Sequence, residues 1–192
     1  MLAQCGEERI EPWPGGEASC PCCKSPVRAK CGEIVIWHWA HESADCDPWA
    51  EPESVWHAGW KSRYPSGCRE VVIGAHRADI KLPNGWVIEL QNSSISPSEI
   101  IEREQFYKRM IWIINAQRFE ENLRIRDRGH CLTFKWKWPR KVWQYARCPL
   151  FFDLGNVVCR VCKIHWHEGG SAGGWMRPIS IDRLGLRDTI AT

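Results

Sequence analysis

The sequence has no long hydrophobic run. None of its 192 residues lies in a stretch of roughly 18 or more consecutive apolar residues, which is the length that a membrane-spanning helix requires. The first residues, MLAQCGEERIEPWPGG, carry charges where a secretion signal needs an apolar segment. We therefore expect a cytoplasmic protein with no membrane partner.

Two other features are missing. The chain contains no internal repeat and no glycine-rich loop of the nucleotide-binding type, so neither a repeat architecture nor a phosphate-cradling loop is predicted. A hydrophobic content of 44% is sufficient for a folded core. The chain length predicts one domain with a small appendage.

Cysteine and tryptophan, in contrast, are abundant. The chain has 11 cysteines and 13 tryptophans. Without an export signal a disulfide framework is not expected, and cysteines that cluster near histidines favour zinc. Most tryptophans are expected in the core, while some could form surfaces on which bases stack.

Positive charge is concentrated in one part of the chain. Residues 103–147 contain twelve Lys or Arg and four Asp or Glu, a net charge of +8, so the remainder must carry −5 to give the overall +3. A basic half beside an acidic half predicts a polyanionic partner. A solvated charged face is the alternative.

The pattern of residues predicts three segments. They are a zinc-binding module rich in Cys, Pro, Gly and Trp (1–50), a central core (51–147), and a C-terminal extension with a β-hairpin and tail (148–192). In the core, Asn-Gly marks a hairpin and Ser96-Pro97 marks a helix start, with Glu99 completing a capping box. The expected elements are a helix over 51–64, strands over 69–74, 76–82 and 86–91, a helix from Pro97, and a strand in RMIWIIN.

Two acids lie in the strands on either side of the Asn-Gly turn. Asp79 is embedded in HRADIKL, and Glu89 shares a strand face with Val87 and Gln91 in WVIELQ. Carboxylates on neighbouring strands could share Mg²⁺ or Mn²⁺, which prefer oxygen ligands. Ordinary strand residues on an inactive fold are the alternative.

The helix–three strands–helix–strand order resembles the αβββαβ core of the PD-(D/E)XK nuclease superfamily, in which the second and third strands carry the acids. The resemblance implies a restriction-endonuclease-like α/β (α+β) fold that often works as a homodimer. It also implies Asp79 and Glu89 as ligands of a catalytic Mg²⁺. Gln91 stands where that superfamily usually has a lysine, and Lys61 could supply the missing charge.

Glu53, His57 and Lys61 are spaced four residues apart in the first predicted helix. This spacing predicts that they lie along one stripe. Glu53 could add a carboxylate and His57 could act as an acid, a base or a phosphate contact. A surface ladder of charges is the alternative.

The chain also resembles a narrower family, the competence protein CoiA-like proteins. The residues that carry this resemblance are Cys20-Pro-Cys-Cys23, His38-Trp-Ala-His41, Glu53, His57, Lys61, Glu70, Arg77-Ala-Asp79, Ile88-Glu-Leu-Gln91, Ser93, Ser96, Glu99, Arg103 and Tyr107. Glutamine after the second acid is typical of that family. The resemblance implies a divergent nuclease domain behind a zinc-binding element, and a role in handling incoming or recombining DNA.

Cys20, Cys23, His38 and His41 have the spacing of a structural Cys₂His₂ zinc site. Other cysteines could replace one of these ligands: Cys46 for one histidine is the main alternative, and Cys22 and Cys31 are others. A second run, Cys159, Cys162, His165 and His167, is better explained as part of a hairpin. Cys159 and Cys162 would point to opposite faces of a strand there.

Several basic and aromatic residues could contact DNA. Arg103 could clamp a phosphate or hold Glu89 or Glu99 in place, and Tyr107 is a further candidate. Lys135 and Lys137 share one face of FKWKW, while its aromatic residues share the other. Tryptophans in the core with lysines in water would give the same pattern.

Our main hypothesis is a metal-dependent endonuclease that hydrolyses phosphodiester bonds in duplex, single-stranded or branched DNA, in recombination or DNA uptake. Asp79, Glu89, Gln91, Glu53, His57 and Lys61 would form its site. The alternative is a non-catalytic zinc protein that binds DNA or protein on an inactive nuclease fold, including an accessory protein or inhibitor from a mobile element.

Overall fold

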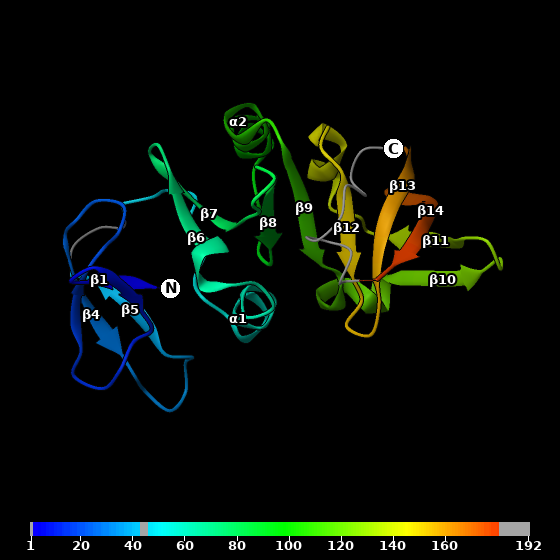
Figure 1. Ribbon diagram of the computed structural model, residues 1–192. Helices are drawn as coiled ribbons and strands as arrows, with labels where there is room; N and C mark the ends of the chain where they lie inside the picture. Colours follow the sequence, from blue (N-terminus) through cyan, green and yellow to red (C-terminus); the bar gives the residue numbers. More distant parts are fainter. Residues whose placement is uncertain (1, 43–45, 181–192) are drawn as a thin grey trace. The chain divides into compact units, whose positions relative to one another are not determined.

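The computed structural model describes residues 2–42 and 46–180. The chain divides into two compact units, Met1–Val87 and Ile88–Thr192. Both units consist mainly of β-sheet with few helices, so the protein is of mixed α/β class (Figure 1). Within the described residues, no helix has the length and apolar character needed to cross a membrane.

The first unit begins with a small antiparallel sheet (Figure 1). Its strand order is β2-β1-β3-β4-β5, with bounds β1 Ala3–Cys5, β2 Glu8–Ile10, β3 Glu17–Ser19, β4 Pro26–Lys30 and β5 His38–His41. Among the described residues, four buried ones form its hydrophobic cluster, Ala3, Cys20, Val27 and Trp39, and five partly buried ones pack against them: Ile10, Ala18, Cys22, Ala29 and Cys46. A core of this size cannot stabilise a sheet of such short strands unaided, so an additional cross-link is expected.

The rest of the first unit contains α1 (Val55–Lys61), a 3₁₀ turn (Ser66–Cys68), β6 (Arg69–Ile73) and β7 (His76–Lys81). The helix is shorter than the predicted 51–64. It begins after Ser54, whose Oγ accepts a hydrogen bond from the His57 backbone N–H at 3.2 Å. Strands β6 and β7 pair antiparallel, with Val71 opposite Ala78.

A tight turn follows β7, as the Asn-Gly pair predicts. The Leu82 N–H donates to the Trp86 carbonyl at 2.8 Å, and the Gly85 N–H donates to the Leu82 carbonyl at 2.9 Å. Gly85 has a φ of 86°, a left-handed conformation that glycine adopts without a steric penalty. The strand β8 (Val87–Gln91) starts directly after this turn.

The second unit contains a large sheet with the order β10-β11-β14-β13-β12-β9-β8 (Figure 1). The bounds are β9 Met110–Asn115, β10 Leu123–Asp127, β11 Leu132–Lys137, β12 Leu150–Asp153, β13 Val158–His167 and β14 Ser171–Ile179, with 3₁₀ segments at Ala116–Asn122 and Lys141–Tyr145. Strands β9 and β12 pair in parallel, and every residue of both is buried. Strands covered on both faces give continuous apolar runs such as MIWIIN.

Helix α2 (Pro97–Tyr107) precedes β9. It starts as predicted: Ser96 Oγ accepts from the Glu99 N–H at 3.1 Å, and proline occupies the first turn. Later in the helix, Glu104 accepts hydrogen bonds from Trp112 Nε1 at 2.9 Å and from the Cys148 N–H at 3.0 Å. One carboxylate thus ties α2 to β9 and to the segment before β12.

Strand β13 contains an irregularity that a glycine accommodates. Its register with β14 shifts between Val161 and Lys163. A Cβ atom on Gly174 would lie 1.9 Å from the Lys163 carbonyl oxygen and 2.9 Å from its carbonyl carbon. Since both are backbone atoms, a side chain at position 174 cannot be accommodated by a change of rotamer.

We therefore expect Gly174→Ala to destabilise the protein by about 1–3 kcal/mol, because the strands must separate to relieve the overlap. Gly169→Ala is the matched control, since a Cβ there meets nothing within 4 Å. Thermal unfolding followed by circular dichroism compares the two. Equal unfolding midpoints for the two variants would refute the steric argument.

Candidate functional site

Three cysteines and one histidine of the first unit come together. The ligand atoms of Cys20, Cys23, His41 and Cys46 all lie within 4.8 Å of one another. Cys23 Sγ is 3.4 Å from His41 Nε2, and Cys20 Sγ is 3.6 Å from Cys46 Sγ. Two of these residues lie at strand ends of the small sheet: Cys20 directly follows β3, and His41 is the last residue of β5.

The chemistry of this group fits zinc. Hydrogen bonds from Ser25 and from His41 lower the pKa of the exposed Cys23 thiol to about 6, more than its slight burial raises it. Cys23 is therefore largely a thiolate at neutral pH, the form that binds metal. Three sulfurs and one imidazole make a Cys₃His set, which is a common structural zinc site.

His38 does not belong to this group, so the predicted Cys₂His₂ set is corrected at one position. His38 and His41 are three residues apart on β5, and side chains at that spacing point to opposite faces of a strand. His38 Nδ1 lies 2.9 Å from the Ile36 carbonyl oxygen instead. Cys46, the main alternative in the sequence, takes its place, while Cys22 and Cys31 lie outside the group.

The second run of potential ligands does not converge. Among the residues that the structure describes, Cys159, Cys162, His165 and His167 form no group that could hold a metal. They are spread along β13, where Cys159 is buried and Cys162 is exposed. This agrees with the interpretation of the segment as part of a hairpin.

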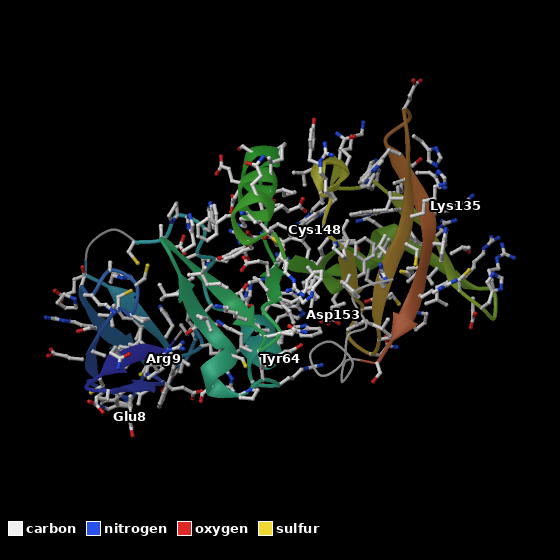
Figure 2. All side chains as sticks on the ribbon, turned by 45° about the horizontal axis from the view of Figure 1, so that its top comes forward. Glu8, Arg9, Tyr64, Lys135, Cys148 and Asp153 are labelled. Atoms are coloured by element: carbon white, nitrogen blue, oxygen red, sulfur yellow. The ribbon has the colours of Figure 1, made fainter. Side chains whose placement is uncertain are left out.

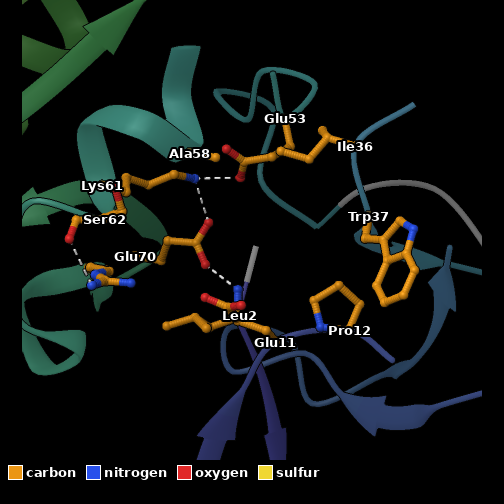
Figure 3. A pocket seen from close by; sticks show the side chains of 11 residues that line it. Leu2, Glu11, Pro12, Ile36, Trp37, Glu53, Ala58, Lys61, Ser62 and Glu70 are labelled. Atoms are coloured by element: carbon orange, nitrogen blue, oxygen red, sulfur yellow. Dashed lines mark hydrogen bonds and ion pairs between the residues drawn. The ribbon is translucent and has the colours of Figure 1, made fainter. Parts of the chain in front are cut away.

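A buried lysine lies between two carboxylates in the first unit. Lys61 Nζ, at the end of α1, is 2.5 Å from Glu53 Oε2 and 2.8 Å from Glu70 Oε1. The Leu2 backbone N–H donates to the other oxygen of Glu70 (Figure 3). Lys61 is 8% exposed and Glu70 is 3% exposed, so the ion pairs are shielded from water.

Neighbouring charges, more than burial, set the pKa values of Lys61 and Glu70. Burial by itself would lower the pKa of Lys61, but the carboxylates of Glu70, Asp79 and Glu53 outweigh it and raise that pKa. Burial would raise the pKa of Glu70, yet Lys61 and Arg77 lower it well below 4.5. Lys61 and Glu70 are therefore both charged at neutral pH, and Lys61 is a permanent cation rather than a base.

A cavity of about 260 Å³ opens beside these ion pairs (Figure 3). Glu53, Lys61 and Glu70 line it together with apolar residues that include Leu2, Pro12 and Trp37. In Figure 3, Trp37 and Pro12 lie across the cavity from Lys61, while Leu2 lies beside Glu70. The first unit thus contains an accessible space next to a fixed positive charge.

The predicted stripe on α1 is wrong in one respect. Glu53 precedes the helix, which starts at Val55. The two ring nitrogens of His57 lie next to other residues: Nδ1 is 2.8 Å from Ser54 Oγ, and Nε2 is 3.5 Å from Glu51 Oε2. Its ring is buried, with both nitrogens next to polar partners.

Asp79 lies in the middle of β7 and is half-buried. Its charge acts on Lys61 and also helps to raise the pKa of Arg77, against the effect of burial. Next to it on β7, the Arg77 N–H donates to Asp47 Oδ2 at 2.8 Å, and His76 Nδ1 lies 2.9 Å from Asp47 Oδ1. Asp79 is thereby part of a polar cluster in the first unit.

A hydrogen bond from Arg103 within the second unit holds the Glu89 carboxylate. Glu89 is 2% exposed, and the Arg103 guanidinium donates to Glu89 Oε2 at 2.7 Å and to Glu99. Of the two roles considered for Arg103, the structure favours the one that holds these acids in place. Gln91 and Tyr107 are also buried, while Lys135 and Lys137 are exposed on β11.

The sequence did not single out Glu70 as a site residue, although it appears among the residues of the family resemblance. The structure places it at the centre of the ion pairs, with a φ of 49°. Left-handed backbone is costly for a residue other than glycine and often marks a functional position. Only the folded chain reveals this conformation.

Two family models match the chain. Residues 4–48 match the model described as Competence protein CoiA, N-terminal domain. Residues 73–161 match the model described as Competence protein CoiA, nuclease-like domain. The comparisons with curated proteins and with solved structures gave no match.

Proposed function

Because the chain belongs to the competence protein CoiA family, we propose that it is a metal-dependent nuclease that processes DNA. The nuclease-like match includes Asp79, Glu89 and Gln91. The observation that carries the proposal is the buried, charged Lys61 between Glu53 and Glu70, with Asp79 close enough to act on its pKa. Acids and a fixed cation beside a cavity are what phosphodiester hydrolysis requires.

The nuclease-like family match supports a shared role for Asp79 and Glu89, because both residues lie within it. We expect the two carboxylates to hold one Mg²⁺ or Mn²⁺, whose chemistry is to acidify water and balance phosphate charge.

The other residues have distinct roles in this proposal. Lys61 offers its positive charge to a phosphate or an attacking water, and Glu53 and Glu70 fix its position. Arg103 orients Glu89, while Gln91 orients water by hydrogen bonding. His57, which Ser54 and Glu51 hold, moves protons or donates to a phosphate.

In the same proposal, Cys20, Cys23, His41 and Cys46 hold a structural Zn²⁺. Four protein ligands leave no open position for catalysis. The metal would cross-link β3, β5 and the segment that follows β5, which compensates for the small core of that sheet.

A second candidate function is a DNA- or protein-binding protein on an inactive nuclease fold. The pairing of Glu89 with Arg103 favours it, because a carboxylate already neutralised by arginine has less capacity for a metal. Such a protein would bind DNA without metal-dependent turnover.

The test is cleavage of duplex, single-stranded and branched DNA with Mg²⁺ or Mn²⁺ added. We expect Asp79→Asn and Glu89→Gln each to reduce cleavage to the level seen without protein. The control is Glu102→Gln, an exposed acid on α2, which should cleave like the unmodified chain. Cleavage that persists in both site variants refutes the assignment, and absence of cleavage in the unmodified chain favours the second function.

A further inference from the structure

One face of the sheet in the second unit is strongly basic. Strand pairing places Arg124 opposite Lys135, Lys135 opposite Gly173, and Gly173 opposite His165. Since opposed residues share a face, this face crosses all four strands β10, β11, β14 and β13. We call it the basic face; its strand residues are Arg124, Arg126, Thr133, Lys135, Lys137, Ser171, Gly173, Trp175, Arg177, Ile179, Val158, Arg160, Lys163, His165 and His167.

The basic face carries cations on every strand and no Asp or Glu among its strand residues. The opposite face of the same strands supplies the core, with Phe134, Trp136 and Met176 buried. Lys135 and Lys137 alternate with buried aromatic residues along β11, and both lysines are exposed to solvent. Lys135 is labelled in Figure 2. Burial explains the aromatic residues, but it does not explain why all the charges opposite them have one sign.

Two tryptophans accompany these cations. Trp138, directly after β11, is 69% exposed, and Lys137 Nζ lies 4.0 Å from its ring centroid. Trp175 on the basic face is half-buried, with the Arg177 guanidinium 5.2 Å from its ring centroid. A large exposed ring costs solubility, and a cation beside it is the arrangement that stacks on a base while it neutralises a phosphate.

The surface is hollowed at two places along this face. One groove of about 710 Å³ is lined by residues that include Arg124, Lys135, Lys137 and Trp138, and Glu121 is the one acid among the described residues there. Another, of about 560 Å³, is lined by Arg147, Arg160, Lys163, Trp175 and Arg177 among others, and by no acid of the described part of the chain. Each groove combines several cations with a tryptophan.

We propose that the basic face binds single-stranded nucleic acid, with phosphates on its lysines and arginines and bases stacked on Trp138 and Trp175. The inference rests on the proposed function in one respect, since a DNA-processing enzyme would use this face to hold the strand. Charge complementarity selects a polyanion. The exposed rings select unpaired bases over duplex, whose bases are already stacked.

The test measures binding of a short fluorescein-labelled oligothymidylate by anisotropy at several salt concentrations. Asp79→Asn protein in a buffer without added Mg²⁺ is used, so that binding is separated from cleavage. We expect Arg124→Gln with Lys135→Gln and Lys137→Gln to weaken binding at least tenfold. The slope of log affinity against log salt should decrease by about 2 for three lost contacts.

Trp138→Ala should weaken binding about tenfold without changing that slope, because stacking is not electrostatic.

The matched control for the triple charge variant removes three exposed charges elsewhere: Lys30→Gln, Lys108→Gln and Arg118→Gln. An equal loss in this control would overturn the proposal, since net charge alone would then explain binding. Equal affinity for duplex DNA, or equal binding to anionic phospholipid vesicles, would also overturn it. If the unmodified chain binds the oligonucleotide but cleaves no DNA, the binding supports this inference and the missing cleavage refutes only the enzymatic proposal.

Discussion

Replacing Cys23 with serine is expected to release zinc and unfold the small N-terminal sheet. An exposed cysteine is normally replaced at almost no cost in stability, and Cys23 is exposed. Its contribution would come through the metal, because the four-residue core of this sheet is too small to fold it alone. Structural zinc contributes on the order of 10 kcal/mol to folding in zinc-finger peptides. The free energy lost with one ligand should therefore exceed the free energy of unfolding of the small sheet.

The matched control is Cys5→Ser, which changes another exposed cysteine in the same sheet. Elemental analysis of the purified protein gives the zinc content, and circular dichroism with limited proteolysis reports on folding. We expect about one zinc per unmodified chain, zinc retained in the control and lost in Cys23→Ser. If Cys23→Ser and Cys5→Ser retain equal zinc and resist proteolysis equally, the Cys₃His assignment is wrong.

Lys61→Met is the second substitution with a large expected effect. It leaves Glu53 and Glu70 buried without the cation that both contact. Removal of one partner from a buried ion pair costs about 3–5 kcal/mol, since the remaining charge is no longer compensated. Urea unfolding at neutral pH measures the loss, and Lys30→Met, an exposed lysine of the same unit, is the control.

The effect of Lys61→Met depends on pH in a defined direction. In the unmodified chain the pKa values of Glu70 and Glu53 are lowered below 4.5. Their stabilisation is therefore present above about pH 4.5 and is lost as pH falls through the folded pKa. The pKa of Lys61 is raised above 10.5, so its stabilisation is complete below that pH and is lost at still higher pH.

In Lys61→Met, burial should instead favour the protonated carboxyls. The difference in unfolding free energy between the two proteins should be largest near neutral pH and should shrink below pH 4.5. Adding Glu70→Gln to Lys61→Met should recover part of the loss at neutral pH, because the uncompensated charge is removed. A difference that is constant from acid to neutral pH would contradict the assignment of charge in this cluster.

Local signals in the sequence predicted several elements well. Ser96, Pro97 and Glu99 identified the start of α2, because capping depends on residues that are neighbours in the chain. The Asn-Gly pair identified the turn after β7, and the apolar run identified β9. Each of these depends on fewer than a dozen consecutive residues.

Other features depend on contacts between distant residues. Cys46 rather than His38 joins the group that could bind a metal, since strand β5 turns the two histidines to opposite faces. The glycines of β14 gave that segment the composition of a tail, although Gly174 fits the irregularity in β13. Glu53 was predicted to lie within a helix, but Ser54 caps the helix after it.

The parallel pairing of β12 with β9 has a practical consequence for fragments of this protein. The sequence suggested a boundary near residue 147, yet Leu150–Asp153 lies directly beside Met110–Asn115 in the sheet. A truncation at that boundary would leave one side of a wholly buried strand without its backbone partners. Open edges of this kind recruit other chains and precipitate, so a fragment intended for crystallisation should extend through the end of β14.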